Sequence, residues 1–152
     1  MTTPDQEEWK FVTSLEWTCA HEGIQRAPGK GDIPVSCPSM FCGGRDDLWT
    51  PEEFFVASVE CCIMMTFLHY GERIGIDLKR YESRAEGVAK MIDKRSRFDR
   101  IALHPKIVVA DETSAKKARQ LIHNTKRACL VSHSLLPDIE VTLDAEISVE
   151  DG

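Results

Sequence analysis

Residues 50–68 read TPEEFFVASVECCIMMTFL, and this stretch predicts the helix around which the fold is built. Thr50 suits the N-cap of a helix, Pro51 suits its first position, and Glu53, three residues after the cap, completes a capping box. The residues that follow are apolar on nearly every helical face. We therefore expect neighbouring elements to bury this helix on several sides.

Size and composition indicate a globular chain. Its 152 residues and 17.2 kDa fit one domain, residues 1–152, and 42% apolar residues exclude disorder as the main state. The net charge of −6 argues against nucleic acid as a partner. The apolar run Phe54–Leu68 contains Glu60 and is shorter than the roughly 20 residues of a membrane span. The first residues contain no basic or apolar leader, so we expect a cytoplasmic protein that does not bind a membrane.

The remaining elements are predicted from periodicity and turn residues. In chain order they are a strand at 11–19, a turn at 27–31, a strand near 33–37, a loop at 43–47, the central helix ending at Gly71 or Gly75, strands at 80–89 and 101–109 around a turn at 93–97, a helix from 111, a short helix at 128–132 and a strand at 139–147. Pro105 predicts an edge or a bulge in its strand. This order indicates an α+β fold and not a parallel βαβ repeat.

Six cysteines are the chemically reactive residues of the chain: Cys19, Cys37, Cys42, Cys61, Cys62 and Cys129. In a reducing compartment they should be free thiols, metal ligands or redox groups and not structural disulfides. No Cys-x-x-Cys pair occurs. A zinc site built from Cys37, Cys42 and the Cys19–His21 segment is a weaker alternative, and we expect no metal and no cofactor.

Three motifs together resemble the OsmC/Ohr family of osmotically induced and organic hydroperoxide resistance proteins. They are Pro51-Glu52 eleven residues before Cys62, then Cys62-x-x-Met65-Thr66, and then Cys129-x-Val131-Ser132 with Leu135. The resemblance implies an OsmC-like fold, with antiparallel β-sheets wrapped around long central helices. It also implies an intertwined homodimer with active sites between the subunits.

The resemblance further implies a thiol-dependent hydroperoxide reductase. Cys62 matches the peroxidatic cysteine, Cys129 matches the resolving cysteine, and Glu52 matches a carboxylate that pairs with an arginine. The implied partners are a hydroperoxide substrate and an external dithiol reductant. A thiolate is the side-chain nucleophile that suits a peroxide oxygen near pH 7.

Two positions depart from the family pattern: the one that holds the family's arginine, and Leu130. The arginine matters because Cys62 lies too far from the helix start for the helix dipole to stabilise its thiolate, so a nearby cation is needed. The family's arginine falls near Met40-Phe41, which contains none. Arg45 or Arg26 could replace it, although the sequence favours a solvated surface charge for each. Leu130 stands where the family commonly has proline.

Alternatives remain open at this stage. Cys61 and Cys62 point about 100° apart on a helix, so one of them can face the site, and the motif selects Cys62. His133 could assist Cys129 or cap a helix.

The chain could also be a non-enzymatic family member that binds a small apolar ligand in the crevice between subunits, or a dimeric scaffold with incidental thiols.

Overall fold

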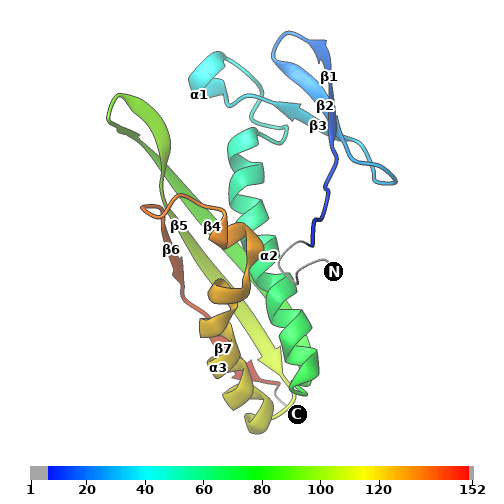
Figure 1. Ribbon diagram of the computed structural model, residues 1–152, viewed down its shortest axis with the longest axis vertical. Coiled ribbons are helices and arrows are strands. Elements are labelled where there is room, and N and C mark those ends of the chain that lie inside the picture. The colour runs from blue at the N-terminus through cyan, green and yellow to red at the C-terminus, as the bar shows by residue number, and fades with distance from the viewer. Residues whose placement is uncertain (1–6, 151–152) are drawn as a thin grey trace. The chain divides into compact units, whose positions relative to one another are not determined.

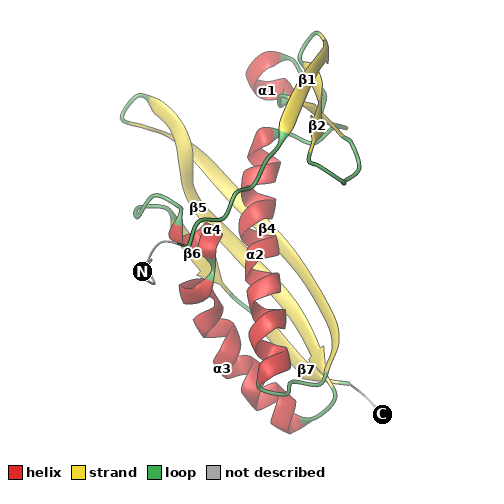
Figure 2. Cartoon of the chain, turned by 45° about the vertical axis from the view of Figure 1, so that its right-hand side comes forward, coloured by secondary structure: helices red, strands yellow, loops and turns green. Residues whose placement is uncertain are grey.

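The computed structural model describes residues 7–150, and its internal contacts divide the chain into two compact units. The first unit extends to Phe54 and the second begins at Phe55. Figure 1 shows the elements in chain order, and Figure 2 separates the helices from the strands by colour. The mixture of helices with antiparallel sheet pairing confirms the predicted α+β class.

The N-terminal unit contains a three-stranded antiparallel sheet in the order β1-β2-β3. Its strands are β1 (Ser14–Cys19), β2 (Glu22–Arg26) and β3 (Ile33–Ser36), followed by the short helix α1 (Ser39–Cys42). The strands predicted at 11–19 and 33–37 are present with shorter bounds, whereas β2 and α1 were not predicted. Gln25 Nε2 donates to the Ser14 carbonyl at 3.0 Å, so β2 is fixed by pairing with β1.

Strand β1 leaves apolar side chains uncovered. All six of its residues are exposed, and Leu15 and Trp17 keep 66% and 74% of their surface accessible. Large apolar side chains at such exposure mark a surface that favours association.

Helix α2 (Pro51–Arg73) begins with the predicted capping box. The Thr50 amide donates to Glu53 Oε2 at 2.9 Å, and the Glu53 amide donates to Thr50 Oγ1 at 3.3 Å. The helix ends at Gly75, whose φ of 71° lies in the left-handed region and whose amide donates to the Glu72 carbonyl. Gly71, the other candidate, is buried inside the helix.

Burial of α2 is confined to one stripe. Val59, Ile63, Phe67 and Gly71 are buried, at intervals of four residues. One chain thus fully covers a single stripe of the helix, and Met65 remains 52% exposed. By length and composition alone, this 23-residue helix could also cross a membrane.

The C-terminal unit is built on a long hairpin of β4 (Leu78–Ile92) and β5 (Arg95–Val109). The turn at Asp93 and Lys94 places both residues at positive φ. The strand predicted at 139–147 is two strands, β6 (Glu140–Leu143) and β7 (Glu146–Val149), and both pair with β5 in parallel.

Pro105 lies opposite the break between β6 and β7. Its neighbours Leu103 and Lys106 are paired with Leu143 and Glu146, while Pro105 itself has no partner on that side. Proline cannot donate a backbone hydrogen bond, so it suits this gap. The predicted bulge is absent at this position, because β4 and β5 stay in register there, with Ser83 opposite Pro105.

Two helices complete this unit. Helix α3 (Glu112–Ala128) begins at the Asp111 side chain, which accepts from the Ser114 amide at 2.7 Å, and it is followed by α4 (Leu130–His133). Ala115, Ala118 and Ile122 are buried on its inner side. Helices α2 and α3 lie side by side on one face of the hairpin (Figures 1 and 2). Their buried stripes and the inner residues of β5 form one core.

Candidate functional site

Cys62 is positioned by the buried stripe of α2. It precedes the buried Ile63, and its half-buried side chain packs against the core, whereas the neighbouring Cys61 is exposed. Thr66, one helical turn later, donates its hydroxyl to the Cys62 carbonyl at 2.7 Å. Cys62 is therefore directed toward the core, and Cys61 toward the surface.

Cys129 occupies the junction between α3 and α4, where it ends one helix and caps the next. Its side chain has no exposed surface. The Ser132 amide donates to Cys129 Sγ at 3.4 Å, so the sulfur takes the place that an oxygen usually occupies at a helix N-cap.

The two thiols lie near each other in the core of the C-terminal unit. Burial raises the pKa of the Cys129 thiol, and the nearby Cys62 thiol acts in the same direction. The hydrogen bond with Ser132 acts in the opposite direction. Cys129 is thus a fully buried thiol in the neighbourhood of Cys62.

Ser132 belongs to this site, although the sequence suggested no role for it. Besides its amide bond to Cys129, its hydroxyl oxygen is buried and has no hydrogen-bond partner within residues 7–150. The Cys-x-x-Ser spacing could have identified it, since an N-cap accepts from the amide two or three positions later.

Glu52 lies in the first turn of α2 and is half-buried. In the described part of the chain, its Oε2 atom is buried without a hydrogen-bond partner. Cys62 follows ten residues later on the same helix, which corresponds to a rise of about 15 Å at 1.5 Å per residue. The structure does not bring Glu52 to the Cys62 sulfur of its own chain.

The two candidate arginines are each paired with two carboxylates of the N-terminal unit. Arg26 contacts Glu16 at 2.8 Å and Asp32 at 3.0 Å, and these carboxylates raise its pKa. Arg45 contacts Asp47 at 2.6 Å and Glu22 at 3.5 Å, with the same effect on its pKa. Both arginines therefore have local counterions in this chain.

Cys37 and Cys42 form a disulfide, whereas the sequence predicted free thiols, metal ligands or redox groups and no structural disulfide. The remaining four, Cys19, Cys61, Cys62 and Cys129, are free thiols. The expectation failed for this pair because a tight turn brings the two residues to a Cα separation of 6.3 Å. Residues 7–150 contain no group of three or more His, Cys, Asp or Glu arranged to hold a metal ion.

His133 and Leu130 lie on α4 without contacting the Cys129 sulfur through a polar group. The His133 ring bonds the Arg127 carbonyl at the end of α3, which agrees with a capping role. Leu130 is 58% exposed and occupies the first position of α4. Because proline also suits the first position of a helix, leucine there leaves the local backbone unchanged.

Comparisons with known proteins agree on one family. A family model described as OsmC-like protein matches residues 44–144, which is more than half of the chain. A curated relative, the uncharacterised protein YmaD of Bacillus subtilis (strain 168), is 20% identical over 118 residues, covering 76% of this chain and 78% of that protein.

Solved structures show the same fold at low identity. An OsmC-like protein of unknown function from Vibrio cholerae has a TM-score of 0.79 at 16% identity, covering 90% of this chain and 99% of that one. An organic hydroperoxide resistance protein from Elizabethkingia anophelis has a TM-score of 0.75 at 20% identity, covering 94% and 99%. The organic hydroperoxide resistance protein OhrB of Bacillus subtilis has a TM-score of 0.63 at 16% identity, covering 91% and 98%.

Proposed function

Because this chain belongs to the OsmC-like protein family, we propose that it reduces hydroperoxides through Cys62 and Cys129. The observation that carries the proposal is the proximity of a half-buried thiol, Cys62, to a fully buried one, Cys129. Organic hydroperoxide resistance proteins among the structural relatives support the choice of substrate class.

The proposed reaction has three steps. The Cys62 thiolate attacks one oxygen of the O–O bond, giving a sulfenic acid, and the other oxygen leaves as an alcohol after taking up a proton. The Cys129 sulfur then attacks the Cys62 sulfur, forming a disulfide and releasing water. An external dithiol restores both thiols by exchange and becomes a disulfide itself.

The division of roles follows from accessibility. A peroxide can reach Cys62, which is half-buried, whereas Cys129 has no exposed surface. The raised pKa of Cys129 keeps its proton in place and so disfavours it as the attacking nucleophile. The position of Cys129 near Cys62 suits the second step, in which Cys129 reacts while it remains in the core.

Glu52 supports a homodimeric enzyme within this proposal. Since Glu52 is about 15 Å of helix rise from Cys62 of its own chain, a carboxylate role at the site requires a second subunit. The exposed faces of α2 and β1 offer apolar surface for such a partner.

We also propose that residues 1–152 act as one domain, since the family match crosses the boundary between the two units.

A cytoplasmic location belongs to the same proposal. The reducing cytoplasm contains dithiol reductants that could return Cys62 and Cys129 to the thiol form after each turnover. The proposed reaction uses neither a nucleic acid nor a membrane as a partner.

Two substitutions test the proposed chemistry. Cys62→Ser should abolish peroxide consumption, because the attacking sulfur is removed. Cys129→Ser should permit one turnover and leave a sulfenic acid on Cys62 that a dimedone probe labels. Cys61→Ser is the matched control, since it removes the adjacent exposed thiol, and it should retain full activity. Repeated turnover of Cys129→Ser at the parent rate would show that Cys129 does not resolve the intermediate.

A cavity beside α4 favours a second candidate function, the binding of a small apolar ligand without catalysis. The cavity has a volume of about 400 Å³. Its apolar lining includes Leu135, Leu136, Ile139 and Val141. A ligand that co-purifies with the protein, together with no peroxide consumption by the reduced chain, would favour this function.

A further inference from the structure

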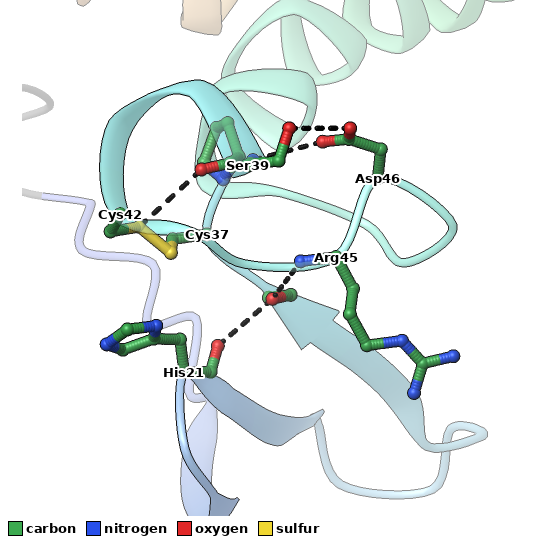
Figure 3. Close-up of a disulfide and its surroundings, with 8 residues drawn as sticks. His21, Cys37, Ser39, Cys42, Arg45 and Asp46 are labelled. Atoms are coloured by element: carbon green, nitrogen blue, oxygen red, sulfur yellow. Dashed lines mark hydrogen bonds between the residues drawn. A yellow bond between two sulfur atoms is a disulfide. The ribbon is translucent and has the colours of Figure 1, made fainter.

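The Cys37–Cys42 disulfide brackets helix α1 in the N-terminal unit (Figure 3). Its Cα separation of 6.3 Å lies within the range of about 4.4–6.8 Å that disulfides usually span. The proposed peroxide chemistry uses neither of these cysteines.

Hydrogen bonds that do not involve sulfur hold this loop in shape. Asp46 accepts from the Ser39 amide at 3.0 Å and from the Ser39 hydroxyl at 2.6 Å. On the other side, Ser36 Oγ accepts from the Arg45 amide at 3.0 Å and donates to the His21 carbonyl at 3.1 Å. The loop should therefore keep its conformation when the disulfide is reduced.

Gly44 reinforces this closure. A side chain at this position would place its first carbon 1.9 Å from the Cys37 carbonyl oxygen, so only glycine permits the close approach. The backbone thus keeps Cys37 and Cys42 near each other by packing as well as by hydrogen bonds.

The two sulfurs differ in access. Cys42 is exposed and Cys37 is half-buried. Between them, Met40 and Phe41 keep 81% and 62% of their surface accessible, so apolar side chains flank the exposed sulfur. An incoming thiolate would reach Cys42 more readily than Cys37. The Arg45 guanidinium points away from both sulfurs (Figure 3).

A structural role explains this disulfide poorly. Its cysteines are five residues apart, and cross-linking so short a loop restricts the unfolded chain less than cross-linking a long one. Exposed disulfides are also those that exchange readily with other thiols.

We propose that Cys37 and Cys42 form a second, reversible redox site that exchanges with an external dithiol. A thiolate of the dithiol attacks the Cys42 sulfur and releases Cys37 as a thiolate, which takes up a proton. The second thiol of the reductant then attacks the mixed disulfide, releases Cys42 and leaves the reductant as its own disulfide. Two electrons pass to the protein, and the reverse sequence reforms the Cys37–Cys42 bond.

The test uses a Cys62→Ser/Cys129→Ser double variant, so its outcome does not depend on the proposed peroxide chemistry. The protein is equilibrated with set ratios of reduced to oxidised dithiothreitol, quenched, alkylated and weighed by intact mass spectrometry. We expect one two-electron transition in which the protein gains two alkyl labels. Its midpoint should fall at the same ratio of reduced to oxidised dithiothreitol whether the titration starts from the oxidised or the reduced protein. The far-UV circular dichroism should not change. Labels that appear only in denaturant, or a transition accompanied by unfolding, would overturn the proposal.

Single substitutions in that background test which sulfur is attacked. Cys37→Ser leaves the exposed Cys42, and Cys42→Ser leaves the half-buried Cys37. We expect Cys37→Ser to form a mixed disulfide with oxidised glutathione severalfold faster than Cys42→Ser. Equal rates, or faster reaction of Cys42→Ser, would contradict the proposed attack at Cys42.

Discussion

The thiol of Cys129, fully buried between α3 and α4, lies close enough to the thiol of Cys62 on α2 for Cys62 to help raise its pKa. The two residues come from helices that lie side by side on the same sheet, and each is held by core packing around it.

One equivalent of hydroperoxide should link Cys62 to Cys129 within a single chain. Peptide mapping without reductant measures the link, and the Cys37–Cys42 peptide is expected in the untreated sample as well. Cys61→Ser should give the same new link, because Cys61 is exposed and points away from the core. A dominant new link that contains Cys61 would contradict the assignment.

Stability should fall at alkaline pH because of Cys129. Burial raises the pKa of this thiol in the folded state, so the folded protein keeps a proton that the unfolded chain releases above its ordinary value of about 8.5. The free energy of unfolding is unaffected below that pH and falls above it, by at most about 1.4 kcal/mol per pH unit. Urea unfolding between pH 7.5 and 10 measures the slope.

Cys129→Ala should reduce that slope, because the titrating group is removed. Cys61→Ala, which removes an exposed thiol from α2, is the matched control. An identical slope for Cys129→Ala and the parent would show that another group is responsible.

Thr50→Ala should destabilise the protein by about 1 kcal/mol, the usual cost of removing a helix N-cap. The substitution removes the hydroxyl that accepts from the Glu53 amide. Thr50→Ser keeps the hydroxyl and serves as the control for the lost cap. Chemical denaturation measures both variants, and equal stability of Thr50→Ala and the parent would show that the capping box is dispensable.

Neither Arg26→Met nor Arg45→Met should shift the pH midpoint for alkylation of Cys62. Each arginine is already paired with two carboxylates of its own unit. The measurement uses a Cys61→Ser/Cys129→Ser background, and Arg84→Met, at an exposed position of β4, is the control. A higher midpoint in either variant would identify that arginine as the cation that supports the Cys62 thiolate.

Light scattering at micromolar concentration should give roughly twice 17.2 kDa. The reason is the uncovered apolar surface of α2, where Met65 is 52% exposed. Met65→Glu places a charge on that face and should favour the monomer. A parent protein that scatters as a monomer at this concentration would contradict the dimer.

Local signals in the sequence predicted much of the fold. The capping box placed the start of α2 correctly, and alternation identified β4 and β5. Strand β2 escaped prediction because its sequence EGIQR does not alternate, and pairing with β1 fixes it. The break between β6 and β7 escaped because alternation continues through Asp144 and Ala145.

The candidate site was predicted less completely. The motif selected Cys62 over Cys61, and the structure leaves Cys61 exposed while Cys62 is half-buried. The Cys37–Cys42 bond was missed because the expectation of a reducing compartment was applied equally to all six cysteines. The turn at Gly43-Gly44 brings this particular pair together. The contacts of Arg26 and Arg45 depend on carboxylates distant in sequence, so spacing could not reveal them.

The parallel pairing of β6 and β7 with β5 has a consequence for the order of folding. The β4–β5 hairpin is local and can form early, whereas β6 and β7 can pair only after the chain has returned along α3 and α4. Cys129 lies within that returning segment. On a chain emerging from the ribosome, Cys62 is made well before the residue that will shield it. Cys62 therefore lacks its core neighbour Cys129 until the returning segment has packed.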